Sequence, residues 1–196
     1  VRTYAGLAAE LTAGFNELFN DGTGRYGQGS QTAQGCALYF ELVPDDHVDP
    51  AGDRLAQAVN EHDGKPDFGI LGAKFAPRTL AEHGHGELAY RLLTQPDFPG
   101  WVHWLEQGAV TLWERWNGES SRNHIMFGDI AAWLVHYLAG IRPLPDHPGL
   151  AELRLDPLFV PDLDRVRACQ ATPQGEVSSH WQRRDGGIEW RFTIPS

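Results

Sequence analysis

The sequence predicts a mainly α protein that ends in a small antiparallel β part. Up to about residue 140, apolar residues recur at intervals of three and four, which is the period of an amphipathic helix. After Ile141, a linker rich in Pro and Gly leads into segments that alternate apolar and polar residues, a pattern typical of strands. We therefore expect a helical part over residues 1–142 and a small β part, itself incomplete, over residues 143–196.

The helical part divides into segments at its capping residues. The first helix is expected from Tyr4 to Phe19, where its apolar stripe ends just before Asp21 and Gly22. Ser30 can cap a second helix, with Ala33, Cys36, Ala37 and Phe40 on its inner face. Asp49-Pro50 starts a third, because Asp caps helices and Pro suits the first helical position. Later helices are expected over 75–82, 85–93, 101–105 and 127–138, with Gly140 just past the last.

Two segments are expected to be extended. The short apolar run Ala109 to Trp113 is the first. The second is a β-hairpin in which residues 176–183 and 188–194 flank the turn Asp185-Gly186-Gly187. An isolated hairpin is only marginally stable, so this one needs further strands around it.

Composition excludes several classes of protein. The 26 acidic against 16 basic residues give a net charge of -10, which repels phosphate backbones and argues against nucleic acid as a partner. The apolar runs are too short to cross a bilayer, so no membrane association is expected. Cys36 and Cys169 lie far apart without CxxC spacing, so neither a disulfide framework nor a zinc site is predicted, and no cofactor is expected. The first residues show no secretion signal, which favours a cytoplasmic location.

Side chains able to bind or react with a ligand are most concentrated between Trp101 and Phe127, where four Trp residues are interleaved with Glu, Arg, Asn and His. Aromatic faces pack against the CH faces of sugars, while carboxylates and amides bind the hydroxyl groups. The same Trp residues could equally pack helices together. Periodicity alone leaves these two interpretations open.

Short motifs recur in a fixed order along the chain. They are Ser30-Gln31-Thr32-Ala33, Leu42-Val43-Pro44, Glu87-Leu88-Ala89-Tyr90, Gly108 to Gly118 with its core Trp113-Glu114-Arg115-Trp116, Asn123-His124, Phe127-Gly128, Trp133-Leu134 and Ala139 to Pro143. In these motifs the chain resembles the inverting α-L-rhamnosidases among the glycoside hydrolases. The resemblance covers nearly the whole chain, and the many blocks that keep the same order make it specific.

The resemblance implies a catalytic barrel of twelve helices in six hairpins, followed by a small β-sandwich domain. It implies that Glu114 is the general base, that His124 lies in the sugar pocket, and that Trp113 and Trp116 shape that pocket as substrate-binding residues. Nothing in the chain resembles the segment that carries the general acid, and about 140 helical residues are fewer than the roughly 200 that twelve helices need. We therefore expect the C-terminal half of a barrel, with the acid outside this chain.

The predicted function is hydrolysis of terminal α-L-rhamnose with inversion, on a rhamnose-containing glycoside. An inverting enzyme needs a carboxylate that activates water and a separate acid for the leaving oxygen. Desolvation by Trp rings would raise the pKa of Glu114, whereas Arg115 on the same side would lower it. The alternatives are a non-catalytic carbohydrate-binding or assembly fragment, or a barrel hydrolase for another sugar. Half a barrel would leave an open edge, which favours self-association or a partner chain.

Overall fold

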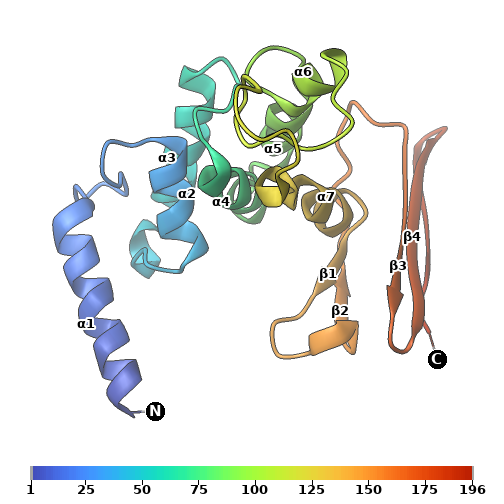
Figure 1. The fold of residues 1–196 in the computed structure, drawn as a ribbon. Helices are drawn as coiled ribbons and strands as arrows, with labels where there is room; N and C mark the ends of the chain where they lie inside the picture. The colour runs from blue at the N-terminus through green and yellow to red at the C-terminus, as the bar shows by residue number, and fades with distance from the viewer. Residues whose placement is uncertain (1, 196) are drawn as a thin grey trace. The chain divides into compact units, whose positions relative to one another are not determined.

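The computed structural model describes residues 2–195 and divides into two compact units (Figure 1). The first comprises Val1–Gly128 and the second Asp129–Ser196. The change from helices to strands that the sequence predicts is present, because every strand follows the last helix. The units separate earlier in the chain than the predicted boundary after residue 142.

Six α-helices build the first unit, and each corresponds to a predicted segment. Ser30 caps the second helix as expected, since its side chain accepts a hydrogen bond from the amide of Ala33 at 3.2 Å. The fourth helix begins at Ile70 rather than Phe75. The elements are α1 (Arg2–Phe19), α2 (Gln31–Tyr39), α3 (Val48–Glu61), α4 (Ile70–Glu82), α5 (Gly86–Thr94) and α6 (Trp101–Glu106), with 3-10 turns η1 (Asp45–His47) and η2 (Ile125–Phe127).

Helices α2, α3, α4 and α5 pack against one another in the first unit. Gly35 permits the close contact of α2 with α4, because a Cβ there would lie 3.0 Å from the backbone of Ala76. The predicted inner face of α2 is partly wrong: Phe40 is exposed, whereas Gln34 is buried. The Gln34 amide group donates to the carbonyls of Gly24 (3.0 Å) and Ala51 (3.3 Å), so its hydrogen bonds join α2 to two neighbouring segments.

The first helix keeps its predicted bounds but exposes its apolar stripe. Side chains in its C-terminal half contact the rest of the unit: Asn16 donates to the Leu42 carbonyl at 2.7 Å and Phe15 stacks on Tyr26. Figure 1 shows the rest of α1 projecting from the unit. Leu11 is 64% exposed. Other exposed apolar side chains of this helix are Tyr4, Leu7, Leu18 and Phe19.

The second unit begins with a broken helix. The expected continuous helix over 127–138 is divided: Phe127 ends η2 in the first unit, and in the second unit α7 (Asp129–Trp133) is followed directly by a π-helical turn η3 (Leu134–Leu138). The π turn forms because the amide of Ala139 bonds to the carbonyl of Leu134, five residues back. Gly140 follows with φ 75°, the left-handed conformation predicted just past the helix end.

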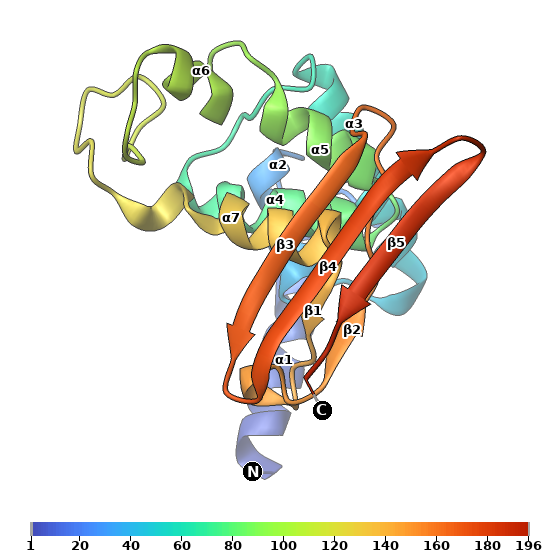
Figure 2. The ribbon, with the colours of Figure 1, turned by 90° about the vertical axis from the view of Figure 1, so that its right-hand side faces the viewer.

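Two antiparallel sheets complete the second unit. One pairs β1 (Ile141–Pro143) with β2 (Leu153–Leu155), and between them lies the turn η4 (Pro148–Leu150). The other has the order β3–β4–β5, shown in red and orange in Figure 2. The predicted hairpin is confirmed as β4 (Gly175–Arg184) and β5 (Gly187–Thr193), and β3 (Arg165–Thr172) supplies the further strand.

A fully buried tryptophan anchors the larger sheet. Trp181 on β4 is 0% exposed, and its indole N–H donates to the carbonyl of Leu138 at 2.7 Å. The ring of Phe159 meets Trp181 edge to face. Among residues 2–195, no helix is both long and apolar enough to span a bilayer.

Candidate functional site

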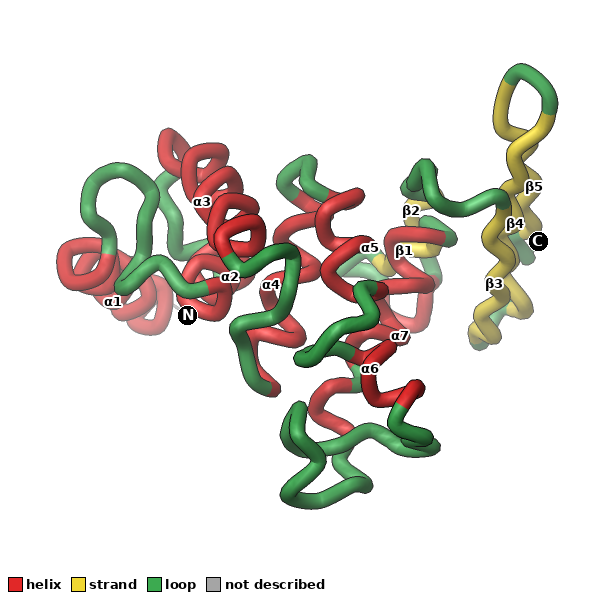
Figure 3. The backbone as a smooth tube through the Cα atoms, turned by 90° about the horizontal axis from the view of Figure 1, so that it is seen from above, coloured by secondary structure: helices red, strands yellow, loops and turns green. Residues whose placement is uncertain are grey.

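The loop between α6 and η2 carries the predicted site residues. Figure 3 shows this segment, residues 107–124, without regular structure, so the extended run expected over Ala109 to Trp113 is wrong. Two backbone hydrogen bonds cross the loop: the amide of Glu114 donates to Ser121 (2.8 Å) and that of His124 to Leu112 (2.9 Å). Two such bonds close a loop but do not make the ladder of a strand.

Three indole N–H groups bind this loop to the surrounding helices and links. Trp101 donates to the carbonyl of Phe127 at 3.1 Å, and Trp104 donates to Trp116 at 2.8 Å. Trp116 in turn donates to the carbonyl of Phe68 at 2.7 Å. Trp101 and Trp104 are buried, so for these two the packing interpretation is correct.

Trp113 and Trp116 flank Glu114 in the sequence and differ in exposure. The Trp113 ring is buried, with the Arg122 guanidinium 4.7 Å from its centroid. Gly118, at φ 69°, passes so close that a Cβ there would lie 2.8 Å from that ring. Trp116 is half-buried against Trp104 and Phe127. Both rings therefore support the loop that presents the carboxylate.

Glu114 is held by its own loop. One carboxylate oxygen, Oε2, accepts hydrogen bonds from the Ser120 hydroxyl at 2.7 Å and from the Ser121 amide at 3.2 Å. These two bonds, with smaller contributions from His124 and Arg115, hold the pKa of Glu114 below its ordinary value. Desolvation raises this pKa and Arg115 lowers it, as expected, but hydrogen bonds to the ionised form outweigh the desolvation.

The structure brings His124 near Glu114, and the histidine is one of the smaller causes that lower the pKa of the carboxylate. The Nδ1 atom of His124 is buried and makes no hydrogen bond within the described residues. The loop therefore places His124 beside a solvent-facing carboxylate. One nitrogen of this histidine ring makes no hydrogen bond to the described residues.

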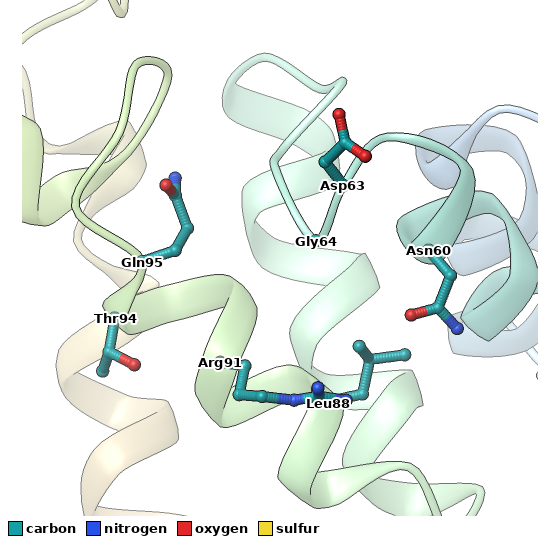
Figure 4. Close-up of a pocket in the computed structure, with 7 residues that line it drawn as sticks. All are labelled: Asn60, Asp63, Gly64, Leu88, Arg91, Thr94 and Gln95. Atoms are coloured by element: carbon teal, nitrogen blue, oxygen red, sulfur yellow. The ribbon is translucent and has the colours of Figure 1, made fainter.

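A groove lies elsewhere on the helical unit, and Glu114 is not among the residues that line it. It has a volume of about 470 Å³ and is shown in Figure 4. Asn60, Asp63 and Gly64 line it from the end of α3 and the turn beyond it, and Arg91 lines it from α5. The remaining lining residues are Leu88, Thr94 and Gln95. Over residues 2–195, no group of three or more His, Cys, Asp or Glu side chains could hold a metal ion.

Helical hairpins followed by a small antiparallel β unit, with a carboxylate set in a tryptophan-rich loop, are the features that the resemblance to helical-hairpin glycoside hydrolases implies. The chain belongs to the bacterial α-L-rhamnosidase family. Residues 1–138 match the bacterial alpha-L-rhamnosidase 6 hairpin glycosidase domain, and residues 140–196 match the bacterial alpha-L-rhamnosidase C-terminal domain. The resemblance seen in the sequence motifs is thereby confirmed.

Curated relatives and solved structures agree with this assignment. An alpha-L-rhamnosidase of Formosa agariphila is 30% identical over 98% of this chain, and one of Streptomyces avermitilis is also 30% identical over 98%. The crystal structure of a Streptomyces avermitilis alpha-L-rhamnosidase complexed with L-rhamnose matches 99% of the chain and 20% of its own, with a TM-score of 0.93 and 29% identity. An Aspergillus terreus alpha-L-rhamnosidase structure matches 99% of the chain and 24% of its own, with a TM-score of 0.90 and 26% identity.

These matches confirm the predicted fold as part of a six-hairpin barrel with its C-terminal domain. The chain spans about one fifth of the length of the two curated relatives. Sequence reasoning missed Ser120 and Ser121, which hold the carboxylate. Their signal is faint, since a Ser pair six and seven residues beyond a Glu is an ordinary loop sequence.

Proposed function

We propose that this chain is the part of an α-L-rhamnosidase that supplies the general base, Glu114. The observation that carries the proposal is a carboxylate at the solvent-facing side of a loop braced by tryptophans, with one oxygen held by Ser120 and Ser121. The low pKa of Glu114 keeps the carboxylate ionised, and only the ionised form can take a proton from water. The L-rhamnose bound to the Streptomyces avermitilis relative supports the choice of sugar.

In the proposed reaction, Glu114 removes a proton from a water molecule while the water oxygen bonds to the anomeric carbon of rhamnose. The electron pair of the broken glycosidic bond goes to the leaving oxygen, which takes a proton from a carboxylic acid. We assign that acid to residues outside this chain, a choice supported by the fraction of the relatives that it spans. Attack from the face opposite the leaving group inverts the anomeric centre.

His124, Trp113 and Trp116 are proposed to bind the sugar around Glu114. The burial of Trp113 limits it to the wall of the pocket. The half-exposed face of Trp116 can contact the sugar ring. The effect of the His124 ring on the pKa of Glu114 supports a place for this ring beside the reacting water.

Glu114→Gln tests the proposal, with release of nitrophenol from a nitrophenyl α-L-rhamnoside as the assay. The substitution keeps the shape of the side chain but removes the base, so kcat should fall by about 10²–10⁴. Glu119→Gln is the matched control, because Glu119 lies in the same loop with its carboxylate bound to Asn117 and should keep its activity. Equal activity of Glu114→Gln and the native enzyme would reject Glu114 as the base. The anomer first formed, followed by NMR, tests inversion.

A non-catalytic carbohydrate-binding or assembly fragment is the second candidate. It is favoured by one observation, that the chain spans only about one fifth of the curated relatives. Measurable rhamnose binding without hydrolysis by any form of the protein would support it. Faster hydrolysis of a nitrophenyl glycoside of a different sugar would instead support a barrel hydrolase with another specificity.

We also propose domain and assembly assignments. Residues 1–142 form the C-terminal half of the catalytic barrel and residues 143–196 form the small β domain, a division supported by family matches that meet near Gly140. The exposed apolar face of α1 is proposed to be the open barrel edge, through which the isolated chain self-associates. Light scattering should then show oligomers of the native chain and monomers of the double variant Leu7→Lys, Leu11→Lys. A monomeric native chain would contradict this proposal.

A further inference from the structure

The two oxygens of the Glu114 carboxylate are in different surroundings. Oε2 accepts both of the hydrogen bonds that reach the carboxylate, from the Ser120 hydroxyl at 2.7 Å and from the Ser121 amide at 3.2 Å. No donor from residues 2–195 reaches Oε1. The carboxylate is therefore fixed at one oxygen and open at the other.

The loop does not need the Ser120 hydroxyl for its own shape. Its backbone is closed by the bonds from Glu114 to Ser121 (2.8 Å) and from Gly118 to Arg115 (3.0 Å). Asn117 adds a further bond by accepting from the amide of Glu119 at 3.1 Å. Ser120 is exposed, and within the described part of the chain its hydroxyl bonds only to the Glu114 carboxylate. The hydroxyl thus acts on the carboxylate rather than on the core.

We propose that Ser120 is a positioning residue that holds Oε2 of Glu114, so that Oε1 is the atom that takes the proton from water. This inference rests on the proposed function for the identity of the reaction. A carboxylate rotates freely about its last side-chain bond unless one oxygen is held, because terminal sp³–sp² torsions have broad minima. When Oε2 is fixed, Oε1 is already oriented to take the proton before the substrate arrives. This lowers the entropic cost of reaching the transition state.

The electrostatics of the loop agree with this geometry. The Ser120 hydroxyl is the largest cause of the lowered pKa of Glu114, and the Ser121 amide is the next. His124 and Arg115 also lower this pKa, and both contribute less than the two hydrogen bonds. Removing the hydroxyl should therefore raise the pKa of Glu114 even though His124 and Arg115 remain.

A carboxyl ¹³C NMR titration of Glu114 in the folded chain tests the positioning directly. We expect Ser120→Ala to raise the pKa of Glu114, and Ser120→Thr, which keeps a hydroxyl, to restore it. Thr23→Ala is the matched control, because the Thr23 hydroxyl donates to Asp21 at 2.7 Å in the same manner. That change should raise the pKa of Asp21 and leave Glu114 as it was. An unchanged pKa of Glu114 in Ser120→Ala would overturn the proposal.

The pH profile of kcat/KM in the active enzyme gives the second measurement. In Ser120→Ala the acidic limb should move to higher pH and the plateau kcat should fall, with recovery of both in Ser120→Thr. A loss of kcat with an unmoved acidic limb would indicate a merely structural role and reject the proposal. If the titration behaves as expected but no form of the protein hydrolyses rhamnosides, the positioning of Glu114 stands and the proposed function fails.

Discussion

The hydrogen bond of the Trp104 indole predicts how much the free energy of unfolding should fall in Trp104→Phe. Trp104 is 2% exposed, and its N–H donates to the carbonyl of Trp116 at 2.8 Å. Leaving that carbonyl without its donor costs about 1–3 kcal/mol. The smaller ring also leaves a cavity of at least a methyl group, which adds roughly 1 kcal/mol. The free energy of unfolding should therefore fall by about 2–4 kcal/mol.

The assay is urea denaturation followed by far-UV circular dichroism, because the substitution removes a fluorescent ring. A change in the midpoint at constant slope measures the change in stability. Trp113→Phe is the matched control. It is buried in the same loop, but its indole N–H makes no hydrogen bond within the described residues, so only the cavity term of roughly 1 kcal/mol applies.

Equal losses for Trp104→Phe and Trp113→Phe would refute the reasoning, because the hydrogen bond would then contribute nothing. The double variant Trp104→Phe with Trp116→Phe gives a further check. The centroids of the two rings are 4.7 Å apart, and the Trp104 indole donates to the backbone carbonyl of Trp116, so the effects of the two substitutions should not add. Additive losses would show that each ring stabilises the loop independently.

Three further perturbations have expected outcomes. Gly118→Ala should lower stability by about 1–3 kcal/mol in urea denaturation, because it strains a residue at φ 69° and directs its Cβ to 2.8 Å from an indole ring. Trp181→Phe should destabilise the β unit by about 2–4 kcal/mol, since the Leu138 carbonyl loses its donor and the smaller ring leaves a cavity, and a loss confined to the helical unit would contradict this. Thr23→Ala should lower stability at neutral pH. Because the folded pKa of Asp21 is depressed, the contribution of this bond is present above the unfolded pKa of 3.8 and is lost as the pH falls through the folded value. A stability difference that persists in acid would count against it.

The sequence by itself determined the helices and their order. Caps such as Ser30 and the apolar period are local signals that located each helix, whereas the start of α4 lies at Ile70, before the predicted Phe75. The β4–β5 hairpin was predictable for the same reason, since its turn and its alternation are adjacent in the chain. The motif around Glu114 also identified the family, because short ordered blocks carry that information without any coordinates.

Only the tertiary structure decided the environment of those residues. Phe40 fits a helical stripe but is exposed, because burial depends on which segments cover a face and not on its period. The lowered pKa of Glu114 follows from Ser120, six residues away in an irregular loop whose path no local pattern encodes. Hydrogen bonds between segments distant in sequence, such as Trp116 to Phe68, set that path. The sequence thus supplied the chemical groups, and long-range contacts set their charge and orientation.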